Sequence, residues 1–320
     1  MRELLRDLAM LLRSRLSRRV GFHRAKDIMI FSTARSGSTW VQEVIASQKN
    51  IKFVSEPLLM ESVTRRQLGA EPSWELTMPG GKRETVLYDY FTRLFSGRCG
   101  YGSPLIRSEF FRWRYDRVLL KLLRGQDLMN WCEANFDVKI VYLLRHPIPV
   151  ALSRDEYKRL PLFLENESFC SAYLSEEQLV CARNIFNHGS ELERKILDWV
   201  LQNIVPLKFS NRENWLCLYY EDIVLNPAPQ IQRLIHDLDL DDPNGAKARL
   251  LKASASTHKS DETTQKYLEQ GSALEGGRAF LVEKWLTRVG QEEQQAVQGI
   301  LDAFGIHAYR ADSALPVHTL

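Results

Sequence analysis

One short segment, V-K-I-V-Y-L-L at residues 138–144, constrains the fold more than any other part of the chain. Its nearly continuous apolar character is typical of a strand in a parallel sheet, because helices cover such a sheet on both faces. A second apolar run, residues 27–32, ends at a loop and is followed by helical spacing of apolar residues over 40–47. Strands that alternate with helices predict an α/β fold: a three-layer sandwich around a central, mainly parallel sheet with right-handed crossovers.

The rest of the pattern predicts one domain over residues 1–320, since no repeat, low-complexity tract or long linker divides it. Further strands are expected over residues 51–55 and 215–220, and helices over 149–158, 191–204, 229–238 and 282–304. Residues 61–137 are interpreted as an insertion on the acceptor side, made of loops and a helix over 114–124. The polar segment 254–277 is expected to be a mobile loop that folds over a bound nucleotide.

The bulk composition limits the partners. Lys and Arg number 43 against 40 Asp and Glu, and this net charge of +3 suits a small anion but does not indicate nucleic acid. The five cysteines are widely spaced without a C-x-x-C pair, so neither a zinc site nor a disulfide framework is predicted and a reducing, cytoplasmic setting is expected. No apolar run is long enough to span a bilayer, and no signal-peptide pattern is present.

The first 26 residues predict a basic amphipathic helix. Leucines recur at helical spacing from Leu4 to Leu16, and arginines from Arg2 to Arg19 lie between them. Such a helix either contacts an anionic membrane surface through residues 1–20 or packs its leucine face on its own domain.

A candidate anion-binding loop, T-A-R-S-G-S-T-W at residues 33–40, joins the first predicted strand to its helix. Glycine lets the backbone approach a ligand, and the N–H groups at a helix N-terminus favour negative charge. Arg35 adds a permanent positive charge with several donors. A turn capped by Ser and Thr is the alternative, but it does not explain the arginine. The loop is not a Walker A motif, because it has one glycine and no lysine.

A second candidate anion-binding segment, R-H-P-I-P-V-A-L-S-R at residues 145–154, directly follows the apolar strand. Arg145 is expected at the carboxyl end of that strand, where α/β sheets bind ligands. Ser153 is expected about two turns into the next helix. Together the two residues would hold one phosphate from two sides.

These two segments together resemble the family of sulfotransferases that use 3′-phosphoadenosine 5′-phosphosulfate (PAPS). Residues 33–40 resemble its 5′-phosphosulfate loop, and residues 145–153 resemble its 3′-phosphate motif. Y-E-D-I-V-L-N-P at 220–227 and W-L-T-R-V-G from Trp285 are further matches. The R-S-G-S pattern is closest to the carbohydrate and bacterial branches, because cytosolic members usually have a lysine in this loop. His146 stands where many relatives have Asp.

The resemblance implies the P-loop-like sulfotransferase fold, PAPS as co-substrate and 3′-phosphoadenosine 5′-phosphate (PAP) as product. It implies that the 3′ phosphate is bound by Arg145 and Ser153. It also implies that the 5′ phosphosulfate is held by Arg35, Ser36, Gly37, Ser38, Thr39 and Trp40. The acceptor would be a hydroxyl, or an amine, of a small molecule or glycan.

The expected chemistry is an in-line displacement that needs orientation and charge stabilisation. Arg35 is expected to stabilise the leaving oxygen. Glu56, in an E-P segment like the one that supplies the catalytic glutamate of the carbohydrate branch, is expected to take the acceptor proton. Alternatively, Glu56 is solvated or paired with Arg65 or Arg66. No metal is expected, since no metal-ligand spacing is present.

The histidines rank below Glu56 as candidates for the base, and the residues that bind the acceptor are less clearly indicated. His146 is expected to shape its turn, and His188 and His258 lack a motif context. A basic and aromatic cluster either lines the acceptor pocket or forms the core face of a helix; it comprises Arg107, Phe110, Phe111, Trp113 and Tyr115.

Two other functions remain open. The first is a P-loop kinase or NTPase, against which the missing Walker lysine and magnesium carboxylate argue. The second is an inactive nucleotide-binding scaffold, against which the retained Arg35, Glu56, Arg145 and Ser153 argue.

Overall fold

The computed structural model describes residues 16–21, 25–59, 81–98, 103–154, 159–252, 254 and 277–318. The expected helix over residues 1–26 and the expected nucleotide loop over 254–277 fall largely outside these residues. A five-stranded sheet of order β3-β5-β2-β6-β7 lies at the centre, and all its neighbouring strands are parallel. The strands are β2 (Asp27–Ser32), β3 (Ile51–Ser55), β5 (Arg117–Leu122), β6 (Val138–Leu144) and β7 (Leu216–Tyr219). The predicted central parallel sheet is therefore confirmed.

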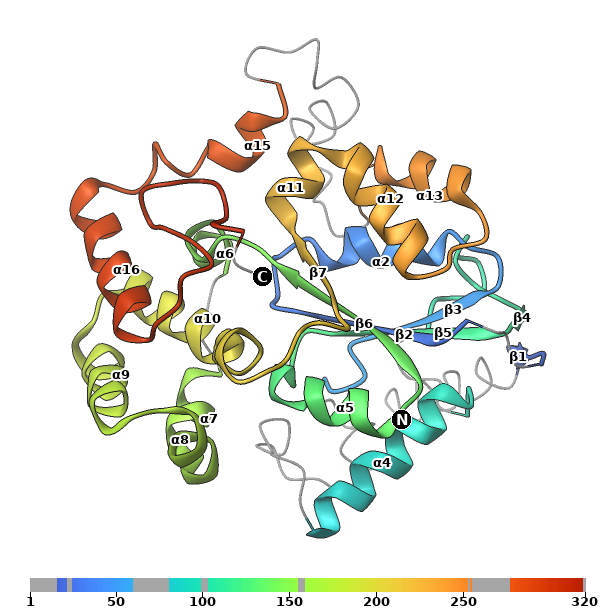
Figure 1. The fold of residues 1–320 in the computed structure, drawn as a ribbon, viewed down its shortest axis with the longest axis horizontal. Coiled ribbons are helices and arrows are strands. Elements are labelled where there is room, and N and C mark those ends of the chain that lie inside the picture. Colours follow the sequence, from blue (N-terminus) through green and yellow to red (C-terminus); the bar gives the residue numbers. More distant parts are fainter. Residues whose placement is uncertain are drawn as a thin grey trace, which may run out of the picture.

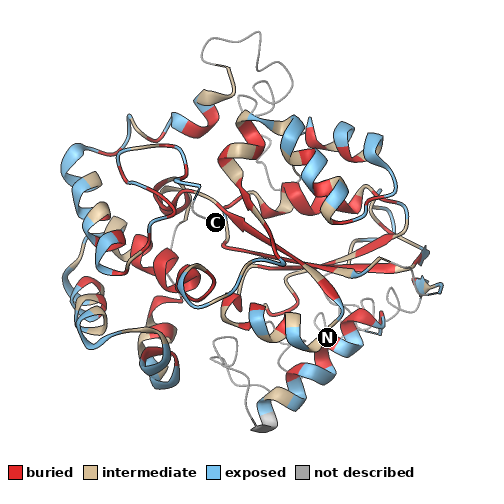
Figure 2. Cartoon of the chain, in the orientation of Figure 1, coloured by how far each residue is buried: buried red, intermediate tan, exposed pale blue. Residues whose placement is uncertain are grey.

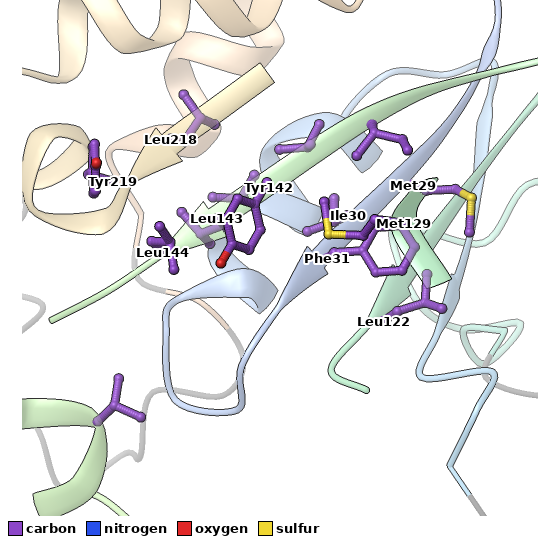
Figure 3. Close-up of a cluster of buried hydrophobic side chains, with 14 of the residues drawn as sticks. Met29, Ile30, Phe31, Leu122, Met129, Tyr142, Leu143, Leu144, Leu218 and Tyr219 are labelled. Carbon is purple, nitrogen blue, oxygen red and sulfur yellow. The ribbon is translucent and has the colours of Figure 1, made fainter. Parts of the chain in front are cut away.

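The strands are apolar because they are enclosed on both faces (Figure 2). Every residue of β5 is buried, and Ile28 to Phe31 of β2 have no exposed surface. Figure 3 shows side chains of β2, β5, β6 and β7 in one cluster with Met129 from the helix below the sheet. Removing this apolar surface from water is the main source of stability for the scaffold that holds the loops.

Helices cover both faces of the sheet, which gives the expected three layers (Figure 1). One face carries α2 (Ser38–Ala46), α11 (Tyr220–Leu225), α12 (Pro227–Asp237) and α13 (Pro243–Leu250). The other carries α4 (Gly81–Phe95) and α5 (Met129–Asn135), with the 3-10 turn η2 (Gln126–Leu128) before it. Beyond the β7 side lie α6 (Pro147–Leu152), α7 (Leu160–Glu165), α8 (Glu167–Tyr173), α9 (Glu176–His188), α10 (Glu191–Lys208), α15 (Ala279–Glu283) and α16 (Gln291–Ala303).

The prediction of a helix over residues 114–124 is wrong. Residues 114–115 form β4 (Arg114–Tyr115), which pairs with β1 (Arg18–Arg19), and residues 117–122 form β5 between β3 and β2. The mostly apolar run at the centre of this segment, residues 118–123, is short, and periodicity alone does not separate a short buried strand from part of a buried helix. Part of residues 61–137, the predicted acceptor-side insertion, is thus a central strand of the sheet.

The order of the strands places the topological switch point of the sheet between β2 and β6. The chain leaves β2 through α2 towards β3 on one side, and it leaves β6 towards β7 on the other. Connections that diverge from adjacent parallel strands open a binding crevice at the carboxyl ends of those strands. The loops after β2 and β6 are the two candidate anion-binding segments.

Candidate functional site

The loop after β2 forms an open cradle of backbone N–H groups. Gly37 occupies the position before α2 with φ at +82°, and Arg35 also has a positive φ of 71°. The Thr33 and Ser36 hydroxyls bond each other at 2.7 Å inside the loop. Among the described residues, the N–H groups of Gly37, Ser38 and Thr39 have no hydrogen-bond partner. These donors, at the start of a helix, fit an anion.

The aromatic ring of Tyr220, at the start of α11, packs directly against Gly37. A Cβ atom at position 37 would lie 2.6 Å from Cδ2 of this ring. The positive φ and the ring contact both require glycine here. The ring also lies edge-to-face with Trp40, at a centroid distance of 6.2 Å.

Arg145, directly after β6, joins this cradle. Its Nη1 donates to the carbonyl oxygen of Arg35 at 2.9 Å, and its guanidinium carbon lies 4.1 Å from the centre of the Tyr220 ring. Its Nε is buried without a partner among the described residues. The structure therefore brings the two predicted anion-binding segments into direct contact.

Ser153 ends α6 rather than lying within a longer helix. Its hydroxyl donates to the Val150 carbonyl at 3.0 Å, and its side chain is half-buried. α6 begins at Pro147 and stops at Leu152, two residues earlier at its start than the sequence analysis expected. No described contact joins Ser153 to the loop after β2.

Arg154, which the sequence analysis did not single out, makes the second link between the segments. Its Nη2 donates to the Ala34 carbonyl at 3.1 Å, and its Nη1 pairs with Asp198 of α10 at 2.8 Å. Both side chains of this ion pair are less than a tenth exposed. Burial lowers the pKa of Arg154 and raises that of Asp198, because each charge loses hydration. A basic residue one position after the motif was the available sequence signal.

Glu56 lies at the carboxyl end of β3, on the same edge of the sheet. Its backbone N–H donates to the Lys121 carbonyl at 2.7 Å, and its Oε1 is 3.6 Å from Lys121 Nζ. The same Nζ donates to Thr39 Oγ1 at 3.2 Å. The carboxylate therefore pairs with Lys121. The alternative partners Arg65 and Arg66 fall outside the described residues.

Lys121 is thus a site residue that the sequence analysis missed, since a helix predicted over 114–124 does not place it at the end of a strand. Its side chain is 4% exposed. Burial lowers its pKa, while the Glu56 carboxylate opposes that shift. A lysine inside the apolar run of residues 118–123 was the signal that could have identified it.

A buried polar network fixes the turn that follows Arg145. The backbone N–H of His146 donates to Glu221 Oε1 at 2.9 Å, and the Tyr309 hydroxyl donates to Glu221 Oε2 at 2.9 Å. The His146 ring stacks on Trp285 at 4.5 Å, and its Nδ1 accepts from the Ile148 N–H. Burial lowers the pKa of His146 to about 4. His146 therefore shapes the turn, as the sequence indicated.

The basic and aromatic cluster is not brought to this edge and is not helical. Phe111 and Tyr115 are buried, Phe110 packs on Phe53, and Trp113 is exposed. Tyr115 precedes the amino end of β5, whereas Lys121 is at its carboxyl end. At roughly 3.3 Å per strand residue, the two ends are well separated. The prediction that the cluster lines an acceptor pocket receives no support.

The described residues contain no group of three or more His, Cys, Asp or Glu side chains arranged to hold a metal ion. Within the same part of the chain, no helix combines the length and apolar character needed to cross a membrane.

The solved structures that resemble this chain include three sulfotransferases. Mouse sulfotransferase SULT7A1, complexed with PAP, is 13% identical with a TM-score of 0.42, covering 93% of this chain and 88% of its own. The sulfotransferase domain of the Synechococcus PCC 7002 olefin synthase is 16% identical with a TM-score of 0.39, covering 89% and 98%. The sulfotransferase domain from the curacin biosynthetic pathway is 17% identical with a TM-score of 0.43, covering 88% and 99%.

The sequence comparison with families is decisive. No curated protein matches the chain. A model of the sulfotransferase domain, however, matches residues 25–302. These residues span the whole sheet, the loop after β2 and the segment after β6. The chain therefore belongs to the sulfotransferase domain family and is a sulfuryl-transferring enzyme.

Proposed function

We propose that this enzyme transfers a sulfuryl group from PAPS to a hydroxyl of a small-molecule or glycan acceptor. The observation that carries the proposal is the contact between the two anion-binding segments, in which Arg145 Nη1 bonds the Arg35 carbonyl over the Tyr220 ring. A donor with phosphate groups at two positions needs two such segments held in fixed relation.

The hydrogen-bond donors of the cradle and of Arg145 fit this co-substrate. The cradle offers unpaired N–H groups at Gly37, Ser38 and Thr39, and the exposed Arg35 side chain has no partner among the described residues. Two buried donors, Trp40 Nε1 and Arg145 Nε, also lack partners there. The 5′ phosphosulfate is assigned to residues 35–40, and the 3′ phosphate to Arg145 and Ser153.

When bound, PAPS supplies an activated sulfuryl group with a phosphate leaving group. Arg35 and the loop N–H groups stabilise the charge that grows on the leaving oxygen. Glu56 takes the proton of the acceptor hydroxyl as the oxygen of that hydroxyl bonds to sulfur. Lys121 holds Glu56 and Thr39 together, so that the base and the cradle keep one geometry.

The experiment that tests the donor is thermal unfolding with PAP, AMP, and ATP with and without magnesium. Binding to the native state raises the midpoint. A rise with PAP that AMP does not match supports the proposal, and transfer to acceptors should then persist in a chelator. A rise only with ATP and magnesium supports a kinase instead, and no rise with any nucleotide supports a scaffold.

A further inference from the structure

A small parallel ladder stands apart from the central sheet and from the site. β1 pairs with β4 in the register Arg18 to Arg114 and Arg19 to Tyr115. The Arg18 N–H donates to the Trp113 carbonyl, and the Ser17 hydroxyl donates to the Arg112 carbonyl, at 2.8 and 2.6 Å. Figure 1 shows the two strands beyond the ends of β3 and β5.

The ladder has one inward and one outward set of side chains. Arg19 turns in to pair with Asp27 at 3.1 Å, and Tyr115 beside it is buried. Arg18 and Arg114 are exposed, and no acidic side chain among the described residues pairs with either. The pleat therefore directs two neighbouring positive charges to solvent.

Large apolar side chains of the same two chain segments are exposed as well. Trp113 is 57% exposed, Leu16 45% and Val20 42%. The Trp113 ring lies edge-on against Phe111, with 5.1 Å between the ring centroids. We call Leu16, Arg18, Val20, Trp113 and Arg114 the ladder patch.

We propose that the ladder patch docks the enzyme on an anionic lipid surface. Tryptophan is favoured at the interface of a bilayer, and arginine is attracted to anionic headgroups. Lys49 is a further exposed basic residue, and it follows Gln48, whose carbonyl accepts from Arg112 Nε. Exposed apolar side chains together with unpaired cations match a lipid headgroup layer better than the apolar face of another protein.

The sequence that leads into the ladder patch has the same character. Residues 1–15, M-R-E-L-L-R-D-L-A-M-L-L-R-S-R, hold four arginines against two acidic residues, with leucines at helical spacing, and end where Leu16 begins. The basic leucine-rich sequence of residues 1–15 and the exposed Trp and Arg of the ladder patch thus point to the same kind of partner.

Docking in this way leaves the catalytic edge accessible. The ladder precedes the amino end of β5, whereas Lys121, Glu56 and the cradle lie at the carboxyl ends of the strands. The ladder patch therefore holds the enzyme at a membrane with the donor site directed away from the lipid.

The test is co-sedimentation of the full chain with phosphatidylcholine vesicles, with and without 30% phosphatidylserine. Binding is expected only with phosphatidylserine and should weaken as salt rises. Trp113→Ala and the double variant Arg18→Glu, Arg114→Glu should each weaken binding, by roughly fivefold for each arginine lost. Arg183→Ala, an exposed arginine on α9, is the matched control and should bind like the unaltered chain.

Each variant is first checked for an unchanged unfolding midpoint and for an unchanged rise of that midpoint with PAP. This check separates a loss of lipid binding from a loss of folding or of PAP binding. Equal binding to both vesicle types, or unchanged binding by the ladder patch variants, overturns the proposal. If the chain does not bind vesicles but forms dimers that Trp113→Ala abolishes, the proposal is overturned. The ladder patch would then bind a second copy of the chain.

Discussion

The guanidinium of Arg145 lies over the aromatic ring of Tyr220, with 4.1 Å between the guanidinium carbon and the ring centre. The same ring packs against Gly37 of the cradle. One aromatic side chain, from the segment after β7, therefore sets the spacing between the loops after β2 and β6. This explains why the Y-E-D segment accompanies the two anion-binding motifs: Glu221, next along, fixes the turn that carries Arg145.

Replacing this ring should weaken donor binding. Tyr220→Leu removes the cation–π contact, which is worth about 1–2 kcal/mol, so the Kd for PAP should rise about 5- to 30-fold. Tyr220→Phe keeps the ring and should bind within about twofold of the unaltered enzyme, because no described hydrogen bond uses the hydroxyl. Titration calorimetry measures both. Equal losses in the two variants would show that the ring does not position Arg145.

The positions of Arg35, Gly37 and Arg145 could be predicted from sequence because short polar motifs follow obvious apolar strands. Strand order could not be predicted, since β5 enters between β3 and β2 only through long-range pairing. The wrong assignment of residues 114–124 had a direct consequence for the site. The predicted helix gave no reason to place Lys121 at the strand ends, whereas Lys121 on β5 contacts Glu56 and Thr39.

Glu56→Gln tests the proposed base. The amide cannot accept the acceptor proton, so turnover should fall by roughly 100- to 10,000-fold, while the Kd for PAP stays nearly unchanged. Single-turnover transfer of radiolabelled sulfate measures the step. Glu109→Gln, an exposed glutamate remote from Lys121, is the control and should retain full turnover. Retained turnover in Glu56→Gln would assign the proton to another group.

The ion pair of Arg154 and Asp198 should be important for stability and for the cradle. Arg154→Met leaves Asp198 buried without its partner and removes a donor from the Ala34 carbonyl. Unfolding in urea should show a loss of about 3–5 kcal/mol, and the double variant Arg154→Met, Asp198→Leu should recover much of it. The exposed pair of Arg310 and Asp312 gives the control, since Arg310→Met should hardly change stability. No recovery in the double variant would mean that the loss comes from other contacts, those to the Ala34 carbonyl and from the Gln202 amide to Asp198.

Some supporting residues carry no motif that a single sequence can reveal. Asp198 lies within the apolar face of α10, and Tyr309 comes from near the end of the chain, so only the fold brings them to Arg154 and Glu221. His146 was expected to shape its turn, but its partners Trp285 and Tyr309 could not be named from sequence, because both contacts cross more than a hundred residues.

The buried His146 predicts how stability depends on pH. Its pKa is about 4 in the folded protein, because burial disfavours the charged ring, against about 6.5 in an unfolded chain. Between these values the unfolded chain binds a proton that the folded one does not. The contribution of the neutral His146 ring to the free energy of unfolding is therefore complete above about pH 6.5 and is lost as pH falls through 4. The full loss is about 3 kcal/mol. His146→Asn keeps an acceptor for the Ile148 N–H but does not titrate. Urea unfolding from pH 4 to 7.5 should therefore give a smaller rise of unfolding free energy with pH in this variant. Parallel curves for the two proteins would show that His146 is not held neutral by its burial.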